Sequence, residues 1–228
     1  MSEPASKPAL LYLSINDGSD TRINKEIATL SRDYAIDFVG VAASTGQPFI
    51  ASQVRSLNLI HGSRRSLLTM ARLLRQVRRL RRHHRYASVH VINENFYLLL
   101  WLLLRGEHVV LDIFDSMFLK TALPRWLVRL GQRFCYAKPA KIIVTDDERA
   151  ALMPDFARAK LVILPNYPFR YEGPRRARDS AHLRILYVGS LSEPRGTAFA
   201  RKLLEAAEEV RVVMAGWQYD EESKALAR

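Results

Sequence analysis

The sequence predicts a doubly wound α/β protein, in which helices cover both faces of a parallel sheet, and three observations lead to this class. Short apolar runs recur along the chain, as is typical of strands buried on both faces. Helical segments alternate with these runs, which is the pattern of β-α-β units. The 228 residues, of which 48% are hydrophobic, suffice for one complete core and part of a second.

The first half of the chain supplies the opening strands of this sheet. Residues 16–20 (NDGSD) follow the first strand as a turn, and their side chains can cap the helix over 25–30. An apolar helix is expected over 96–104. Strands are expected over 9–15, 36–42, 57–60, 88–92 and 107–113.

The second half continues the alternation and then stops it. A helix over 123–134 is indicated by Leu123, Leu127, Leu130 and Phe134 at helical spacing. Strands over 141–144 and 161–164 flank a helix over 146–153. Residues 165–180 hold three prolines and many charges without apolar periodicity, so they indicate a linker.

These segments predict three parts, which are a complete domain over 1–166, a linker over 167–182 and an incomplete domain over 183–228. The last part contains one β-α-β unit, with strands over 183–188 and 210–215 and a helix over 197–209. One such unit leaves sheet edges uncovered, so we expect the rest of this domain to be missing or supplied by a partner.

Several classes of protein are disfavoured by what the sequence lacks. Cys135 is the only cysteine, which excludes an internal disulfide framework, and it is expected to be a small buried side chain. Residues 1–8 do not resemble a secretory signal, and the apolar run 96–104 is too short to span a membrane. No glycine-rich phosphate fingerprint or H-E-x-x-H helix is present, and no metal site or cofactor is predicted. We therefore expect a cytoplasmic protein.

The net charge of +12 is concentrated between Arg64 and Arg85, which hold nine arginines and no acidic residue. At about 100° per residue these residues form a helix with Leu67, Met70, Ala71, Leu74 and Val77 on one side. Three interpretations remain open: a solvated surface helix, attraction to anionic lipid on the inner face of the membrane, and, less favoured without aromatic residues in the run, nucleic-acid binding. We expect lipid attraction, carried by Arg72, Arg75, Arg79 and Arg82.

Polar residues follow four of the predicted strands, at the carboxyl ends where open α/β sheets bind ligands. Each alone is commonly a turn or a helix cap, and their shared position makes them candidates as a group. They are Asn16, Asp17 and Gly18, then Asn93 and Glu94, then Asp112 and Asp115, and finally Thr145 and Asp146.

Several segments in order resemble the retaining family-4 glycosyltransferases, whose GT-B architecture pairs two Rossmann-like domains. The segments include VHVINEN, VVLDIFD, KIIVTDDERAALM and LVILPNYP, followed by LRILYVGSLSEPRG and VRVVMAG, which look like the opening of a nucleotide-sugar domain. The resemblance covers nearly the whole chain. It implies an acceptor-side first domain and a donor-side second domain that is truncated here.

The resemblance also assigns roles to particular residues. Gly189 would lie beneath the donor phosphates, and Arg195 would face the diphosphate in place of the family's lysine. Ser190 stands where the family has arginine, and Phe114 where it has histidine, which leaves Asp115 and Asp112 as the catalytic candidates. The family's paired glutamates would lie beyond residue 228, so this chain alone is expected to be inactive.

The implied reaction is transfer of a sugar from a nucleoside-diphosphate sugar, used as co-substrate, to a lipid-linked or polysaccharide acceptor. One alternative is a non-catalytic, membrane-recruiting subunit of a split glycosyltransferase, whose partner supplies the donor domain. A weaker alternative is a sugar-nucleotide epimerase of the same architecture, which would not need the basic helix.

Overall fold

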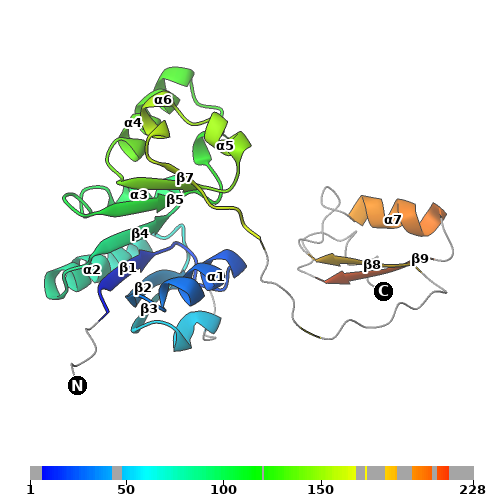
Figure 1. The fold of residues 1–228 in the computed structure, drawn as a ribbon, viewed down its shortest axis with the longest axis horizontal. Coiled ribbons are helices and arrows are strands. Elements are labelled where there is room, and N and C mark those ends of the chain that lie inside the picture. Colours follow the sequence, from blue (N-terminus) through cyan, green and yellow to red (C-terminus); the bar gives the residue numbers. More distant parts are fainter. Residues whose placement is uncertain are drawn as a thin grey trace. The chain divides into compact units, whose positions relative to one another are not determined.

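The computed structural model describes residues 7–42, 48–119, 121–167, 173, 183–188, 197–206 and 210–215. The chain divides into two compact units, Met1–Phe169 and Arg170–Arg228 (Figure 1), and each is described by itself. Among the described residues no helix is long and apolar enough to cross a membrane.

The first unit is built on a seven-stranded, wholly parallel sheet with the strand order β3-β2-β1-β4-β5-β6-β7. The chain moves outward from β1 to β3 and then returns to the other side of β1 with β4, so the winding reverses between β1 and β4. This confirms the predicted doubly wound α/β class. The strands are β1 Ala9–Leu13, β2 Ala35–Ala42, β3 Ser56–His61, β4 Ser88–Ile92, β5 Val109–Asp112, β6 Lys141–Val144 and β7 Leu161–Ile163.

Helices connect these strands, as the parallel pairing requires. The predicted helix over 96–104 instead begins at Glu94 and ends at Leu100, after which residues 101–106 form turns and Gly106 adopts a φ of 86°. The helices are α1 Thr21–Leu30, α2 Leu67–His83, α3 Glu94–Leu100, α4 Arg125–Tyr136, α5 Asp147–Ala151 and α6 Asp155–Arg158, with short 3₁₀ turns η1 Phe49–Ser52 and η2 Met117–Leu119.

Alternate residues of each strand feed two separate cores. Along β1, Leu10 and Tyr12 point to the face covered by α1 and η1, while Leu11 and Leu13 point to the opposite face. The second face is covered by α2, α3 and α4, which contribute Leu73, Phe96 and Cys135 among others to one cluster. Cys135 is buried as predicted, and burial raises the pKa of its thiol to about 12.

Helix α2 packs on the sheet through part of the predicted apolar side, Met70, Leu74 and Val77, together with Leu73. The structure buries Thr69, Leu73 and Val77, whereas Leu67 is 87% exposed and Ala71 faces solvent. Polar contacts also hold this helix: Gln76 Nε2 donates to Asn58 Oδ1 of β3 at 2.7 Å, and Arg81 Nε donates to Glu107 Oε1 at 2.9 Å. The spacing of hydrophobic residues does not predict such polar contacts between different elements.

The second unit contains one parallel strand pair and one helix among its described residues. Strand β8, Leu183–Val188, pairs with β9, Val210–Ala215, and α7, Thr197–Ala206, connects them. Both strands have the predicted bounds, and residues 207–209 of the predicted helix lie outside the described part of the chain.

Candidate functional site

The predicted polar residues of the first unit follow β1, β4, β5 and β6, which are successive neighbours in the sheet. All four strands are parallel, so their carboxyl ends meet at one edge, where the winding also reverses. This edge is the candidate site.

Asn93 joins two of these loops. Among the non-glycine residues that the structure describes, Asn93 alone has a positive φ, 65°. Asparagine tolerates this conformation better than most residues do. Its Oδ1 accepts hydrogen bonds from the backbone N–H groups of Phe114 (2.8 Å) and Asp115 (3.2 Å). Asn93 therefore fixes the loop after β5 and leaves Asp115 exposed at the edge.

Glu94 lies inside the protein rather than at the open edge. Its carboxylate, which is fully buried, accepts hydrogen bonds from Ser116 Oγ (2.7 Å), the Met117 N–H (2.8 Å) and the Tyr136 hydroxyl (2.6 Å). These three donors belong to the loop after β5 and to α4. Although it was predicted as a substrate-binding residue, Glu94 organises the loop that carries Asp115.

The loop after β1 is held in a tight turn. Asp17 Oδ1 accepts a hydrogen bond from the Ser19 N–H at 3.0 Å. Gly18 has a φ of 88°, and a Cβ atom at this position would lie only 2.3 Å from Ile50 Cδ1. Although burial by itself favours the neutral acid, the bonds to Ser19 lower the pKa of Asp17. Asn16 and Asp17 are partly exposed, so a polar ligand at the edge can reach them.

Thr145 and Asp146 form the fourth corner. Thr145 Oγ1 donates to Asp146 Oδ2 at 2.6 Å, and Asp146 Oδ1 caps α5 by accepting from the Arg149 N–H at 2.7 Å. Arg149 Nη1 in turn donates to the Phe114 carbonyl at 2.6 Å. Asp146 is thus a helix cap whose helix braces the loop that carries Asp115.

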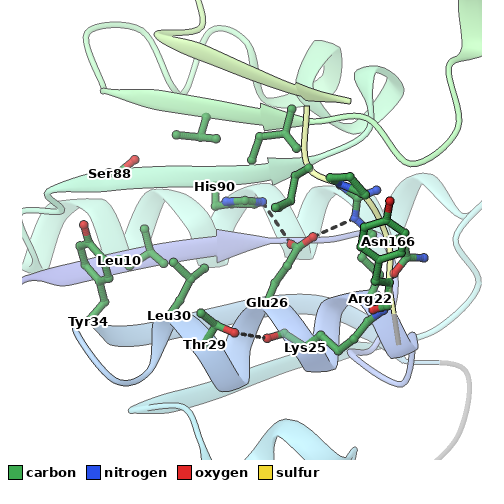
Figure 2. Close-up of a pocket in the computed structure, with 15 residues that line it drawn as sticks. Leu10, Arg22, Lys25, Glu26, Thr29, Leu30, Tyr34, Ser88, His90 and Asn166 are labelled. Atoms are coloured by element: carbon green, nitrogen blue, oxygen red, sulfur yellow. Dashed lines mark hydrogen bonds and ion pairs between the residues drawn. The ribbon is translucent and has the colours of Figure 1, made fainter. Parts of the chain in front are cut away.

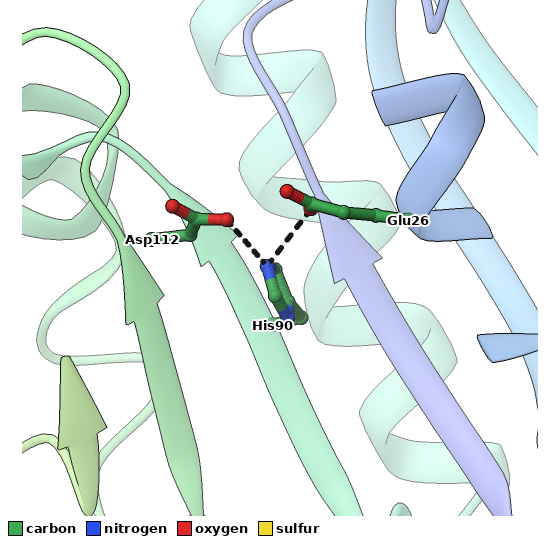
Figure 3. A group of neighbouring side chains, drawn as sticks. All are labelled: Glu26, His90 and Asp112. Atoms are coloured by element: carbon green, nitrogen blue, oxygen red, sulfur yellow. Dashed lines mark ion pairs between the residues drawn. The ribbon is translucent and has the colours of Figure 1, made fainter. Parts of the chain in front are cut away.

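Beside this edge lies a buried group of four charged side chains that the sequence did not predict as a group. Figure 3 shows three of them, Glu26, His90 and Asp112. Arg22 of α1 donates from Nε to Glu26 Oε1 at 2.8 Å and from Nη2 to Asp112 Oδ1 at 2.5 Å. His90 Nε2 lies 3.4 Å from Glu26 Oε2 and 3.5 Å from Asp112 Oδ2. We call Arg22, Glu26, His90 and Asp112 the charged quartet.

Groups of opposite charge face one another in the quartet. Although burial by itself favours a neutral ring, Asp112 and Glu26 raise the pKa of His90 to about 9. Burial by itself also favours neutral acids, but hydrogen bonding and the charge of His90 lower the pKa of Glu26 to about 2. Burial raises the pKa of Asp112 to about 6, and the Arg22 guanidinium and the His90 ring lie against its carboxylate. Two cations therefore face two carboxylates.

Three quartet side chains could also offer ligand atoms to a metal ion, since the nearest atoms of Glu26, His90 and Asp112 all lie within 4.8 Å of one another. The Arg22 guanidinium bound to both carboxylates opposes a divalent cation there, because a proton on His90 already balances the charge. The arrangement supports an ion-pair network. The expectation that no metal is needed stays a prediction.

A cavity of about 430 Å³ runs from the quartet along the sheet face beneath α1 (Figure 2). Its apolar wall includes Leu10, Leu30 and Val110, and Lys25 donates to the carbonyl of Tyr167 at 2.8 Å across its rim. The cavity and the edge meet at Arg22, whose guanidinium lies 4.3 Å from the ring centre of Phe114. Arg22 therefore contacts both the Asp112 carboxylate and the ring of Phe114 in the loop after β5.

Signals for the quartet were present in the sequence. Arg22 and Glu26 are spaced i, i+4 on a helix, and His90 lies between two valines in the strand SVHVI. Their partnership required the strand order, because Arg22 and Asp112 are 90 positions apart.

Two other sets of residues were predicted to bind a partner or ligand outside this edge. Arg72, Arg75, Arg79 and Arg82 are exposed on α2. Gly189 and Arg195, predicted to bind the donor phosphates, lie outside the described residues.

Comparisons with known proteins show similarity in fold and no match in sequence. No family model matches the chain, and no curated protein sequence matches it. Its structure resembles the lipopolysaccharide outer core galactosyltransferase WaaB in its apo form, with 12% identity and a TM-score of 0.60 over 96% of the chain. It also resembles Anabaena HepE, solved in complex with UDP and glucose, with 10% identity and a TM-score of 0.62 over 96% of the chain.

A third similar structure is a putative UDP-N-acetylglucosamine 2-epimerase from Listeria monocytogenes, with 9% identity and a TM-score of 0.55 over 97% of the chain. The chain spans 63%, 64% and 65% of WaaB, HepE and the epimerase, respectively. At these identities the likeness shows a shared α/β, Rossmann-like fold.

Proposed function

We propose that this chain carries the acceptor side of an enzyme that transfers a sugar from a nucleoside-diphosphate sugar to a hydroxyl of a lipid-linked or polysaccharide acceptor. The observation that carries the proposal is the exposed Asp115, held at the carboxyl edge of a sheet whose fold resembles that of a galactosyltransferase and of a protein solved with UDP and glucose. A shared fold does not determine which reaction a protein catalyses, so the proposed reaction depends on the residues at this edge.

The edge offers what a sugar hydroxyl needs. Asn16, Asp17 and Asp115 are partly or fully exposed and present oxygen atoms that accept hydrogen bonds from hydroxyl groups. The loop of Asp115 is fixed from three directions, by Asn93, Glu94 and Arg149. Such fixing matters because positioning of reactants can lower a barrier by roughly 7 to 11 kcal/mol.

The proposed roles follow from these placements. Asp115 contacts the transferred sugar or the acceptor hydroxyl, and Asp112 positions the edge through Arg22 and Phe114. Gly189 and Arg195 of the second unit hold the donor diphosphate, where a cation stabilises the negative charge that develops on the leaving group. No cofactor is required beyond the nucleotide sugar.

The proposed place of action is the cytoplasmic surface of an anionic membrane, where a lipid-linked acceptor would be found. Arg72, Arg75, Arg79 and Arg82 are exposed on α2, and within the described part of the chain none of them makes an ion pair. Basic side chains near an anionic bilayer each contribute roughly 1 kcal/mol of attraction.

The test is a transfer assay on the protein isolated from its source with an antibody to the first unit, so that any associated partner is retained. Radiolabelled nucleotide sugars are supplied with a membrane lipid extract, and labelled lipid or glycan is measured. Asp115→Asn should lower turnover at least about tenfold, whereas Asp155→Asn, on the exposed surface of α6, should not.

The outcomes separate the alternatives. Conversion of the free nucleotide sugar to an epimer without transfer would identify an epimerase and overturn the proposal. An unchanged rate of sugar transfer by the Asp115→Asn variant would show that this edge does not take part in the reaction. The 228-residue chain by itself is expected to give no measurable turnover, and robust turnover would refute the need for further donor-side residues.

A further inference from the structure

Helix α4 presents an apolar row to solvent although its other side is packed against the domain. Trp126, Leu130 and Phe134 are 66%, 47% and 47% exposed, and they recur at every fourth position, so they lie on one side of the helix. We call these three residues the α4 row. The buried side is formed by Cys135 and Tyr136, so the orientation of the helix is fixed.

The α4 row belongs to a wider surface. Trp101 packs edge-on against Phe134, with ring centres 5.8 Å apart, and Lys138 Nζ lies 4.4 Å from the centre of the Trp101 ring. A surface hollow is lined by Trp101, Leu130 and Phe134 together with Arg133 and Lys138. Large apolar side chains gathered in this way on a surface mark an interaction site more often than scattered ones do.

A row of cations runs beside the apolar row. Arg125, Arg129 and Arg133 are exposed at the same four-residue spacing, one position before each member of the α4 row. Among the described residues none of the three forms an ion pair. The surrounding 30 residues, 116–145, contain six lysines and arginines and no aspartate or glutamate.

We propose that this surface docks α4 into the interface of an anionic bilayer, with the α4 row among the acyl chains and the arginine row at the phosphate level. Interfacial helices combine a bulky apolar side, often with tryptophan, and flanking cations in this way. The charge argues against a second copy of the chain as the occupant, because pairing two such surfaces brings like charges together without an acidic partner.

The position of α4 relates the docking surface to α2 and to the edge that carries Asp115. Helix α2, with its exposed arginines, packs on the same side of the sheet as α4, so both can face one membrane. A connecting helix in a parallel sheet runs back from the carboxyl edge, so the Trp126 end of α4 lies toward the edge that carries Asp115. The docked row would hold that edge near a lipid-linked acceptor. The inference rests on the proposed membrane attraction and not on sugar transfer.

The experiment measures partition of the 228-residue chain onto vesicles of phosphatidylcholine with phosphatidylglycerol, at about 0.1 M and about 1 M salt, where Debye lengths are ~10 Å and ~3 Å. We expect the combined Trp126→Ser, Leu130→Ser and Phe134→Ser variant to lose at least about tenfold in partition at both salt concentrations. Phe49→Ser, which removes a 73% exposed aromatic elsewhere, is the matched control for Trp126→Ser and should partition like the parent.

Two further measurements decide between occupants. A chain with Trp126 as its only tryptophan should show quenching by brominated acyl chains on these vesicles. Replacing Arg72, Arg75, Arg79 and Arg82 by glutamine should reduce partition at low salt while leaving that quenching in the bound fraction. Unchanged partition of the triple variant, or Trp126 left unquenched, would overturn the proposal. So would a dimer in solution that the triple variant abolishes.

Discussion

Two buried carboxylates, Asp112 and Glu94, lie on opposite faces of the seven-stranded sheet and are satisfied in different ways. On the α1 face, Asp112 is fully buried beside two cations, Arg22 and His90. On the opposite face, Glu94 is equally buried and accepts hydrogen bonds from Ser116, Met117 and Tyr136. One site is neutralised by opposite charge, and the other is solvated by neutral donors.

This difference predicts different vulnerabilities. A carboxylate paired with cations becomes an uncompensated buried charge when one cation is lost, which is among the most destabilising changes in proteins. A carboxylate held by three neutral donors loses only one of several bonds when one donor is removed. The first site should also respond to pH, because one of its cations is a histidine.

The largest expected effect is that of Arg22→Met, which leaves Glu26 and Asp112 without their guanidinium. We expect a loss of about 3 to 5 kcal/mol in the free energy of unfolding, measured with urea at pH 7. Arg158→Met breaks an exposed pair with Asp155 and should cost less than about 1 kcal/mol. Equal costs for both variants would contradict a buried, charge-balanced quartet.

The next effect is a pH dependence that His90 imposes on the α1 face. The pKa of His90 is raised in the folded state from 6.5 to about 9, so its stabilisation is complete below about pH 6.5 and is lost as pH rises through about 9. The slope of unfolding free energy should approach about −1.4 kcal/mol per pH unit in this window. Between about pH 6.5 and 9, the unfolding free energies of the parent and of His90→Gln, measured with urea, should change differently with pH. An unfolding free energy of the parent that does not change in this window would show that His90 is not charged in the folded protein.

The smallest effect concerns the opposite face. Tyr136→Phe removes one neutral donor from Glu94 and should cost about 1.5 to 3 kcal/mol, with faster amide exchange at Ser116 and Met117. Tyr34→Phe is the control, because within the described residues the Tyr34 hydroxyl makes no recorded hydrogen bond. If Tyr136→Phe cost as much as Arg22→Met, the contrast between the two faces would fail.

Much of the fold, and part of the site, could be predicted from local patterns. Strand and helix periodicities are properties of neighbouring residues, so apolar runs such as 88–92 and 141–144 became strands with these bounds. The positions of Asn16, Asn93, Asp115 and Asp146 after successive strands followed from the same pattern. The sequence by itself therefore determined the α/β class and the edge at which candidate polar residues gather.

Only the tertiary structure decided what each side chain does there. Glu94 turned inward because Tyr136 and Ser116, both distant in sequence, meet its carboxylate. Arg22 met Asp112 because β1 lies beside β4 and β4 beside β5, a strand order that no local period encodes. The hydrogen bond from Gln76 of α2 to Asn58 of β3 likewise joins residues of two separate elements. Periodicity is a short-range signal, whereas burial and ion pairing depend on which distant residues share a contact.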